Sequence, residues 1–130
     1  MSESEEKTEA PSATDAPAEP ETPRITIDDF AKVDLRIGTI TSAEPHPNAD
    51  RLLVLKVDVG EPENRQLVAG IRSAYDVRTL VGQQIVVVAN LEPAKLRGVE
   101  SQGMLLAGKD ETGLCVLSPG KRLLNGTKVS

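Results

Sequence analysis

The segment from Gln84 to Gly108 constrains the fold most, because two short apolar runs enclose a long polar stretch within it. The first run, IVVVA at residues 85–89, is rich in β-branched side chains and is typical of a buried strand. The second run is MLLA at residues 104–107. The polar stretch between them contains proline and glycine, which favour a loop over regular structure. A loop held between two buried strands is a common position for binding residues.

Other segments predict further short strands, each bounded by turn residues. Residues 33–40 and 52–59 alternate between apolar and polar side chains, as half-buried strands do, and Gly38 indicates a bulge or bend in the first of them. A capping signal that begins at Thr26 predicts a short helix at 27–32. The remaining predicted elements are a strand at 65–71, a helix at 73–80, strands at 84–91 and 103–108, and a hairpin turn at 110–113 leading into a strand at 114–117.

At least five strands, with a helix between the third and the fourth, match the layout of the OB-fold, a five-stranded barrel. We therefore predict an all-β domain with small added helices over residues 25–130. Closing the sheet into a barrel would also remove the exposed edges of these apolar strands. An open α+β sheet built from the same elements is the alternative.

The excess of acidic over basic side chains is confined to the N-terminal end of the chain. Residues 1–24 contain seven acidic and two basic side chains and account for the whole formal net charge of −5. Because this segment has too few apolar side chains to offset the entropy cost of ordering, we predict a disordered tail. Residues 25–130 are then formally neutral, and their charge does not argue against an anionic partner.

The sequence lacks the motifs of catalysis and metal binding. The one histidine, His46, lies between two prolines and is expected to be a loop residue, and the one cysteine, Cys115, is expected to be a small buried side chain. Phosphate-loop and serine-nucleophile motifs do not occur. We therefore predict no catalytic residue, no metal site, no cofactor and no enzyme activity. No apolar segment reaches membrane-spanning length or follows the acidic start, which predicts a cytoplasmic protein.

Aromatic side chains are nearly absent: the chain has one Phe, one Tyr and no Trp. Proteins that bind single-stranded nucleic acid usually stack its bases on several aromatic side chains. This chain cannot build such a platform. A nucleic-acid partner would have to be recognised through its backbone and its shape.

The polar stretch from Asn90 to Gln102 is the first candidate binding site. Lys95 and Arg97 are suited to phosphate groups, and the Arg97 guanidinium can contact two oxygens at once. Asn90, Ser101 and Gln102 are suited to hydrogen bonds with phosphate, sugar or 2′-hydroxyl groups. The alternative is an ordinary solvated hairpin loop with scattered charges.

Four further residues complete the candidate set: Lys32, Arg36, Arg51 and Met104. Arg36 is expected on the outer surface of the barrel, where Lys32 and Arg51 could join it as phosphate contacts. For Arg36 the alternative is a surface ion pair with Asp34. Met104 is expected at the base of the loop or against the ligand, although core packing is the ordinary role of a methionine at the start of a strand.

The segments DFAKVDLRIGTI (29–40), HPNADRL (46–52), RQLVAGI (65–71) and LVGQQIVVVANLEPAKLRGVESQGMLLA (80–107) resemble the tRNA-binding domain family. This family includes stand-alone structure-specific tRNA-binding proteins, the C-terminal domain of many bacterial methionyl-tRNA synthetases, EMAP II-like domains and the secretion chaperone CsaA. The resemblance covers about residues 25–130, and its most specific part is the pattern ANLxPxKLxGxxSxGM.

The resemblance implies an OB-fold that binds the outside corner of L-shaped tRNA with little sequence preference. It implies that Ser101 and Met104 of the SxGM motif, and Asn90 of the ANL motif, take part in tRNA binding. It further implies a homodimer for a stand-alone protein, acting in trans as an accessory factor or beta chain of methionyl-tRNA synthetase. Neither DNA nor a membrane is expected as a partner.

Two other functions compete with tRNA binding. A peptide-binding export chaperone of the CsaA type would use an apolar groove at the dimer interface. A purely assembling subunit would only dimerise or tether a synthetase. A contiguous exposed apolar patch would favour the chaperone, whereas a cation-lined patch would favour RNA.

Overall fold

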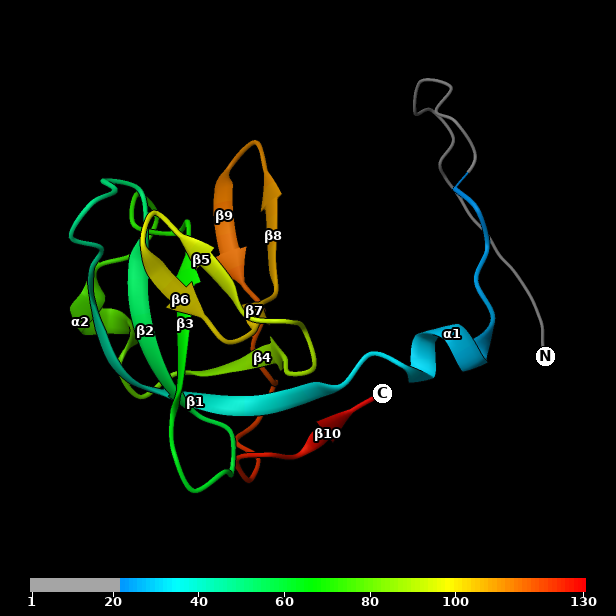
Figure 1. Ribbon diagram of the computed structural model, residues 1–130. Coiled ribbons are helices and arrows are strands. Elements are labelled where there is room, and N and C mark those ends of the chain that lie inside the picture. Colours follow the sequence, from blue (N-terminus) through cyan, green and yellow to red (C-terminus); the bar gives the residue numbers. More distant parts are fainter. Residues whose placement is uncertain (1–21) are drawn as a thin grey trace.

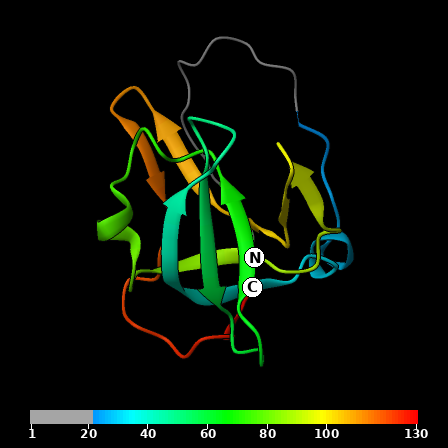
Figure 2. The same ribbon diagram turned by 60° about the vertical axis from the view of Figure 1, so that its left-hand side comes forward.

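One antiparallel sheet, with strand order β3–β2–β1–β4–β7, curls into a nearly closed barrel in the computed structural model, which describes residues 22–130 (Figures 1 and 2). The strands of the barrel are β1 (Leu35–Pro45), β2 (Leu53–Asp58), β3 (Arg65–Ala69), β4 (Gln84–Val88), β7 (Met104–Leu105) and β10 (Lys128–Val129), which pairs with the start of β1. The other elements are α1 (Ile27–Ala31), α2 (Val77–Leu80), and the hairpins β5 (Ala94–Leu96) with β6 (Val99–Ser101) and β8 (Ala107–Asp110) with β9 (Gly113–Val116). The predicted all-β barrel of the OB-fold is confirmed, with α2 between β3 and β4.

The barrel is filled by the apolar faces of its strands. Ile40, Leu55 and Val57 are fully buried, and so are Ile85 on β4 and Leu80 of α2. Because successive strand side chains point to opposite faces, the alternation seen in the sequence places these residues inside. Burial of this apolar surface is the main force that holds the barrel together.

Gly38 allows β1 to cross β2 at close range. A Cβ atom at this position would lie 2.6 Å from Cγ1 of Val57 and 2.7 Å from Cγ1 of Val59. The predicted irregularity of this strand does occur, but it lies further along, where the pairing of β1 with β2 shifts between Ile40 and Ser42. A shift of this kind increases the local twist and helps the sheet to close.

Several elements differ in length from their predictions. Strand β1 continues to Pro45, five residues beyond the predicted end, because its second half pairs with β2. Helix α2 begins only at Val77, after the Asp76 side chain accepts a hydrogen bond of 2.8 Å from the Arg78 amide and caps the helix. The predicted strand at 103–108 is divided at Leu106 into β7 of the barrel and β8 of a separate hairpin.

The polar stretch from 90 to 102 was predicted as a loop, and this prediction was wrong, because it contains the β5–β6 hairpin. The hairpin turns at Arg97 and Gly98, whose φ angles are 55° and 91°. Two successive positive φ angles are typical of the tight turns that match the twist of a β-hairpin.

The two ends of the described chain differ. Residues 22–24 are exposed and form no helix or strand, and the rest of the predicted tail, residues 1–21, lies outside the described residues. At the other end, the Gln84 side chain donates to the Leu123 carbonyl at 2.6 Å and accepts from the Leu123 amide at 2.9 Å. Residues 22–130 contain no helix that is long and apolar enough to cross a membrane.

Candidate functional site

His46 fixes the β5–β6 hairpin to the turn that follows β1. Its side chain is 4% exposed, Nδ1 accepts a hydrogen bond of 2.9 Å from the Asn48 amide, and Nε2 lies 2.9 Å from the Leu96 carbonyl oxygen. Since Nδ1 is the acceptor, Nε2 carries the proton and donates to Leu96. His46 is thus a buried support of the hairpin, and not only a residue of an exposed loop.

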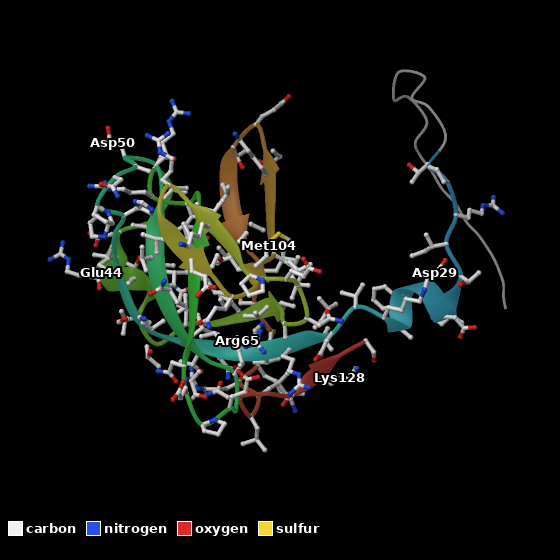
Figure 3. The ribbon with its side chains drawn as sticks, viewed as in Figure 1. Asp29, Glu44, Asp50, Arg65, Met104 and Lys128 are labelled. Atoms are coloured by element: carbon white, nitrogen blue, oxygen red, sulfur yellow. The ribbon has the colours of Figure 1, made fainter. Side chains whose placement is uncertain are left out.

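Five cations gather at the end of the barrel to which this hairpin leads. Arg97 at the hairpin turn reaches the Asn48 carbonyl with Nη2 at 3.5 Å, and Arg72 reaches the Asp50 carbonyl with Nη1 at 3.2 Å. Asp50 marks this end in Figure 3. We call the exposed group the cationic end; it comprises Arg51, Arg72, Lys95, Arg97 and Lys109.

The charges of the cationic end are only partly balanced by neighbouring carboxylates. Glu100 lies opposite Lys95 in the β5–β6 pairing. The Asp110 carboxylate accepts from the Thr112 amide at 2.8 Å and from the Thr112 hydroxyl at 2.6 Å, and these hydrogen bonds lower the pKa of Asp110. Among residues 22–130, none of the five cations makes an ion pair. Exposed cations without a bound carboxylate are available to an anionic partner.

Ser101 and Gln102 close the barrel between β3 and the segment that enters β7. The Ser101 hydroxyl is buried, accepts from the Val68 amide at 3.0 Å and donates to the Gly103 carbonyl at 2.8 Å. The Gln102 side-chain oxygen accepts from the Gln66 amide at 2.9 Å. These two side chains satisfy backbone groups at the edge of β3, which stops the edge from pairing with another chain.

Asn90 joins the end of α1 to the start of β1. Its side-chain oxygen accepts from the Asp34 amide at 2.9 Å, and its amide nitrogen donates to the Lys32 carbonyl at 2.5 Å. Arg36 pairs with Asp34 at 3.0 Å, and this hydrogen bond lowers the pKa of the Asp34 carboxyl. The Lys32 side chain is exposed and lies 3.7 Å from the Asp29 carboxylate.

The nine predicted site residues therefore occupy three places. Arg51, Lys95 and Arg97 lie together at the cationic end. Lys32, Arg36 and Asn90 surround the junction of α1 with β1, on the side of the barrel that Asp29 marks in Figure 3. The last three, Ser101, Gln102 and Met104, follow the β5–β6 hairpin, and of these Ser101 is buried whereas Met104 is half-exposed.

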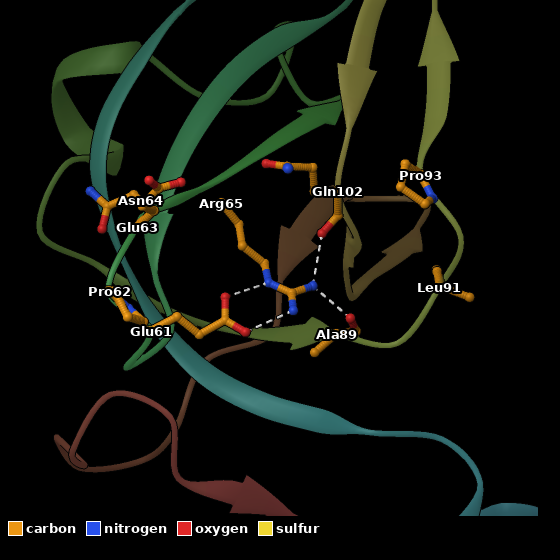
Figure 4. Close-up of a pocket in the computed structure, with 9 residues that line it drawn as sticks. All are labelled: Glu61, Pro62, Glu63, Asn64, Arg65, Ala89, Leu91, Pro93 and Gln102. Carbon is orange, nitrogen blue, oxygen red and sulfur yellow. Dashed lines mark hydrogen bonds and ion pairs between the residues drawn. The ribbon is translucent and has the colours of Figure 1, made fainter.

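A pocket of about 610 Å³ lies beside β3, and Arg65 forms its floor (Figure 4). The Arg65 guanidinium contacts both oxygens of Glu61 at 2.8 Å and donates to the carbonyl oxygens of Ala89 and Gln102. The hydrogen bond from Arg65 lowers the pKa of Glu61. Because the guanidinium is already used within the protein, the pocket offers little to an anion.

Four functional features were missed in the sequence: Arg65, Arg72, Lys109 and the support role of His46. Arg65 had one local signal, the spacing of four residues from Glu61, whereas His46 and Arg72 contact residues distant in the sequence, and Lys109 lines a pocket with the distant Arg51. Cys115 was expected to be buried, and this expectation was wrong, because it is exposed on β9. Within residues 22–130, no three His, Cys, Asp or Glu side chains are grouped so that they could hold a metal ion.

Known proteins resemble this chain in sequence. A family model described as "Putative tRNA binding domain" matches residues 35–128. Methionine–tRNA ligase of Thermotoga maritima is 56% identical over 106 residues, which are 82% of this chain and 17% of that enzyme. The corresponding enzyme of Thermococcus kodakarensis is 52% identical over 105 residues, which are 81% of this chain and 14% of the enzyme. The chain thus spans less than a fifth of the length of these ligases.

Solved structures show the same barrel. A MetRS related protein from Pyrococcus horikoshii superposes with a TM-score of 0.77 at 32% identity, covering 84% of this chain and all of that one. The chaperone CsaA of Bacillus anthracis superposes with a TM-score of 0.76 at 37% identity, covering 83% of this chain and all of that one. Both likenesses extend over the whole barrel, and so the fold and its topology are shared.

Proposed function

Because the chain belongs to the tRNA-binding domain family, we propose that it binds folded tRNA at the cationic end, with little preference for sequence. The observation that carries this proposal is the gathering of five cations from the β5–β6 hairpin, the turn after β1, the segment after β3 and the β8–β9 hairpin. Cations from separate elements of a rigid barrel have fixed positions. They can therefore match the fixed phosphates of a folded RNA better than the moving phosphates of a flexible strand.

Within this proposal, the predicted residues have different roles. Arg51, Lys95 and Arg97 contact phosphate, and Arg72 and Lys109 join them. Ser101 holds the segment after the β5–β6 hairpin against β3, and Asn90 holds the junction of α1 with β1. Their hydrogen-bonding atoms are used within the protein, and a direct contact of either with tRNA stays a prediction.

Three further residues were predicted to contact tRNA: Lys32, Arg36 and Gln102. Lys32 and Arg36 reach tRNA only where it extends along the start of β1. Gln102 has one side-chain atom bound to β3, and its amide nitrogen can donate to RNA.

Binding to three RNAs tests the proposal: folded tRNA, the same tRNA unfolded, and an unstructured oligonucleotide. We expect the folded tRNA to bind most tightly, with affinity that falls as salt rises, because phosphate contacts release counterions. Equal affinity for all three would reduce the cationic end to a general polyanion surface. No binding to any of them would refute tRNA binding and favour a peptide-binding role like that suggested by the CsaA likeness.

The cellular role that we propose is based on the similarity to methionine–tRNA ligases. We propose that the protein is not an enzyme by itself and that it presents tRNA in trans to a methionyl-tRNA synthetase, in the cytoplasm. Support comes from the methionine–tRNA ligases, in which the matching segment is a small part of a long chain. Co-purification of the protein with the synthetase, retained when nuclease is added, would separate a direct protein contact from one bridged by tRNA.

We also propose a homodimer formed through α1. The helix projects from the barrel and has no buried residue within the described part of the chain (Figure 1). The exposed apolar side chains in and around it are Ile25, Ile27, Phe30 and Val33, with exposed fractions of 66, 78, 38 and 37%. A helix with an uncovered apolar face is stabilised when a second copy covers that face.

Replacing Ile27 and Phe30 with glutamate is expected to convert the dimer into a monomer. The two carboxylates would be buried without partners in the interface, which costs several kcal/mol. Light scattering should give twice the 13.9 kDa chain mass for the wild type and the chain mass for the variant. The control variant, Leu117→Glu with Leu124→Glu, changes two exposed leucines outside α1 and should stay dimeric. A wild type that is monomeric at micromolar concentration would contradict the proposal.

A further inference from the structure

Two adjoining pockets lie between the cationic end and the barrel. The first has a volume of about 230 Å³ and is lined by apolar residues from β3 and the segment after it, from β7, and from both strands of the β8–β9 hairpin. Met104 belongs to it and is 48% exposed, whereas its neighbours Val68 and Leu105 are 8 and 9% exposed. Figure 3 shows Met104 near the bases of both hairpins. An exposed methionine above a buried apolar floor is a surface that a flat apolar group can cover.

The second pocket adjoins the first, because Gly70 and Leu114 line both. Its volume is about 470 Å³, and its lining includes the cations Arg51 and Lys109 and the hydroxyl-bearing residues Ser73 and Thr112. Among the residues that the structure describes, no carboxylate lines it. The joined pockets are therefore apolar at one end and cationic at the other.

We propose that the joined pockets hold one unstacked nucleotide of the bound tRNA. Its base lies in the apolar pocket against the Met104 thioether, and its phosphate lies between Arg51 and Lys109. This inference rests on the proposed tRNA binding and adds a base contact to it. Sulfur makes favourable contacts with aromatic rings, so one methionine can hold one base although the chain has almost no aromatic side chains. Bases splayed out of loops are what proteins most readily hold on RNA.

The charge at the second pocket favours a nucleotide over an apolar peptide side chain. A peptide would bring an uncharged backbone next to Arg51 and Lys109 and would leave their charges unbalanced. A nucleotide carries its negative charge on the phosphate and its apolar area on the base, which is the same division as in the pockets. A peptide occupant is accordingly an outcome that the test must detect.

Gly70 offers a variant that blocks the pockets without straining the fold. A Cβ atom there would have only the Leu52 side chain nearby among residues 22–130, at 3.7 Å, which is an ordinary contact. Gly70→Val adds a branched side chain at a residue that lines both pockets, and we expect it to narrow them. Gly120→Val is the matched control, since a Cβ atom at Gly120 would meet no described residue within 4 Å and Gly120 lines neither pocket. Met104→Ala removes the base contact by a second route, and Met104→Leu retains an apolar surface.

Affinity for folded tRNA is compared with affinity for a fully paired RNA duplex, which has no unstacked base. We expect Gly70→Val and Met104→Ala to weaken tRNA binding about 2- to 13-fold, the range of one sulfur–ring contact, and to leave duplex binding unchanged. Gly120→Val should bind both RNAs like the wild type, whereas Met104→Leu, which keeps an apolar surface but lacks the sulfur, should lose less tRNA affinity than Met104→Ala. A tRNA with 2-aminopurine at one unpaired corner position at a time should show a fluorescence change on binding that Gly70→Val abolishes.

Three results would overturn the nucleotide pocket. They are equal weakening of tRNA and duplex, no weakening of either, and displacement of 2-aminopurine tRNA from the pocket by an apolar peptide with the same affinity as by tRNA. A failure of tRNA binding itself would appear differently, as a wild type that does not distinguish folded tRNA from the duplex. If Gly70→Val is neutral while loss of Lys95 and Arg97 weakens binding, only the nucleotide pocket is refuted.

Discussion

Replacing Gly103 with alanine is expected to destabilise the domain by about 3 kcal/mol or more. Gly103 has a φ of +136°, and a Cβ atom there would lie 2.8 Å from the Val88 carbonyl oxygen. That oxygen belongs to the backbone of β4, so it cannot move without disturbing the sheet. The strain would distort the segment that contains Ser101 and Met104. Because this segment closes the barrel and contains predicted site residues, the substitution should reduce both stability and tRNA binding.

Gly113 provides a matched control for this prediction. Its φ is also +136°, but a Cβ atom there would meet nothing within 4 Å among residues 22–130. Gly113→Ala should therefore lower the free energy of unfolding only by the cost of the backbone conformation, on the order of 1–2 kcal/mol. Urea unfolding of both variants measures the difference. An equal loss of free energy in the two would mean that close contact with β4 is not why residue 103 must be glycine.

Removing the two hairpin cations is expected to give the largest loss of tRNA affinity. In Lys95→Gln with Arg97→Asn, both charges are lost, whereas asparagine tolerates the φ of 55° at position 97 and should keep the turn intact. Two lost phosphate contacts should reduce the salt slope by about 1.8, which corresponds to roughly 60-fold weaker binding in ~0.1 M salt. Filter binding or fluorescence anisotropy across a salt series measures both quantities.

The control for this charge loss is Lys121→Gln with Arg122→Gln, which removes the same charge from the C-terminal segment. That segment lies at the opposite end of the barrel from the hairpin (Figure 1). This control variant should change the affinity for tRNA less than about 3-fold, because it removes only long-range attraction. Equal losses in the two double variants would show that net charge, and not the cationic end, determines binding.

The barrel could be predicted from the sequence because its strands carry their own signal. Residues 53–58 alternate around a buried face, and the Val- and Ile-rich run of β4 is buried as its composition indicates. The β5–β6 hairpin carries no such signal, because β5 is exposed throughout and has no apolar alternation. The position of its turn could not be predicted either, since arginine is an uncommon residue at a positive φ.

The candidate site could be predicted only in part, because a residue type does not reveal which hydrogen bonds its side chain makes. Ser101 and Asn90 were selected for their polar groups, yet those groups bind the backbone of residues more than 30 positions away. His46 reaches Leu96 across 50 positions. By contrast, Lys95 and Arg97 are exposed as expected, and among residues 22–130 neither makes an ion pair, although Glu100 lies opposite Lys95.

The central claim is that tRNA docks on the cationic end, and amide chemical-shift mapping of the ¹⁵N-labelled protein tests it most directly. Folded tRNA is titrated into the labelled protein, and the perturbed amides are located on the barrel. We expect the largest changes at residues 95–98, 48–51, 72 and 104–109. Changes confined to residues 25–36 and 61–65, with the hairpin unaffected, would contradict the claim and place the RNA on the other side of the barrel.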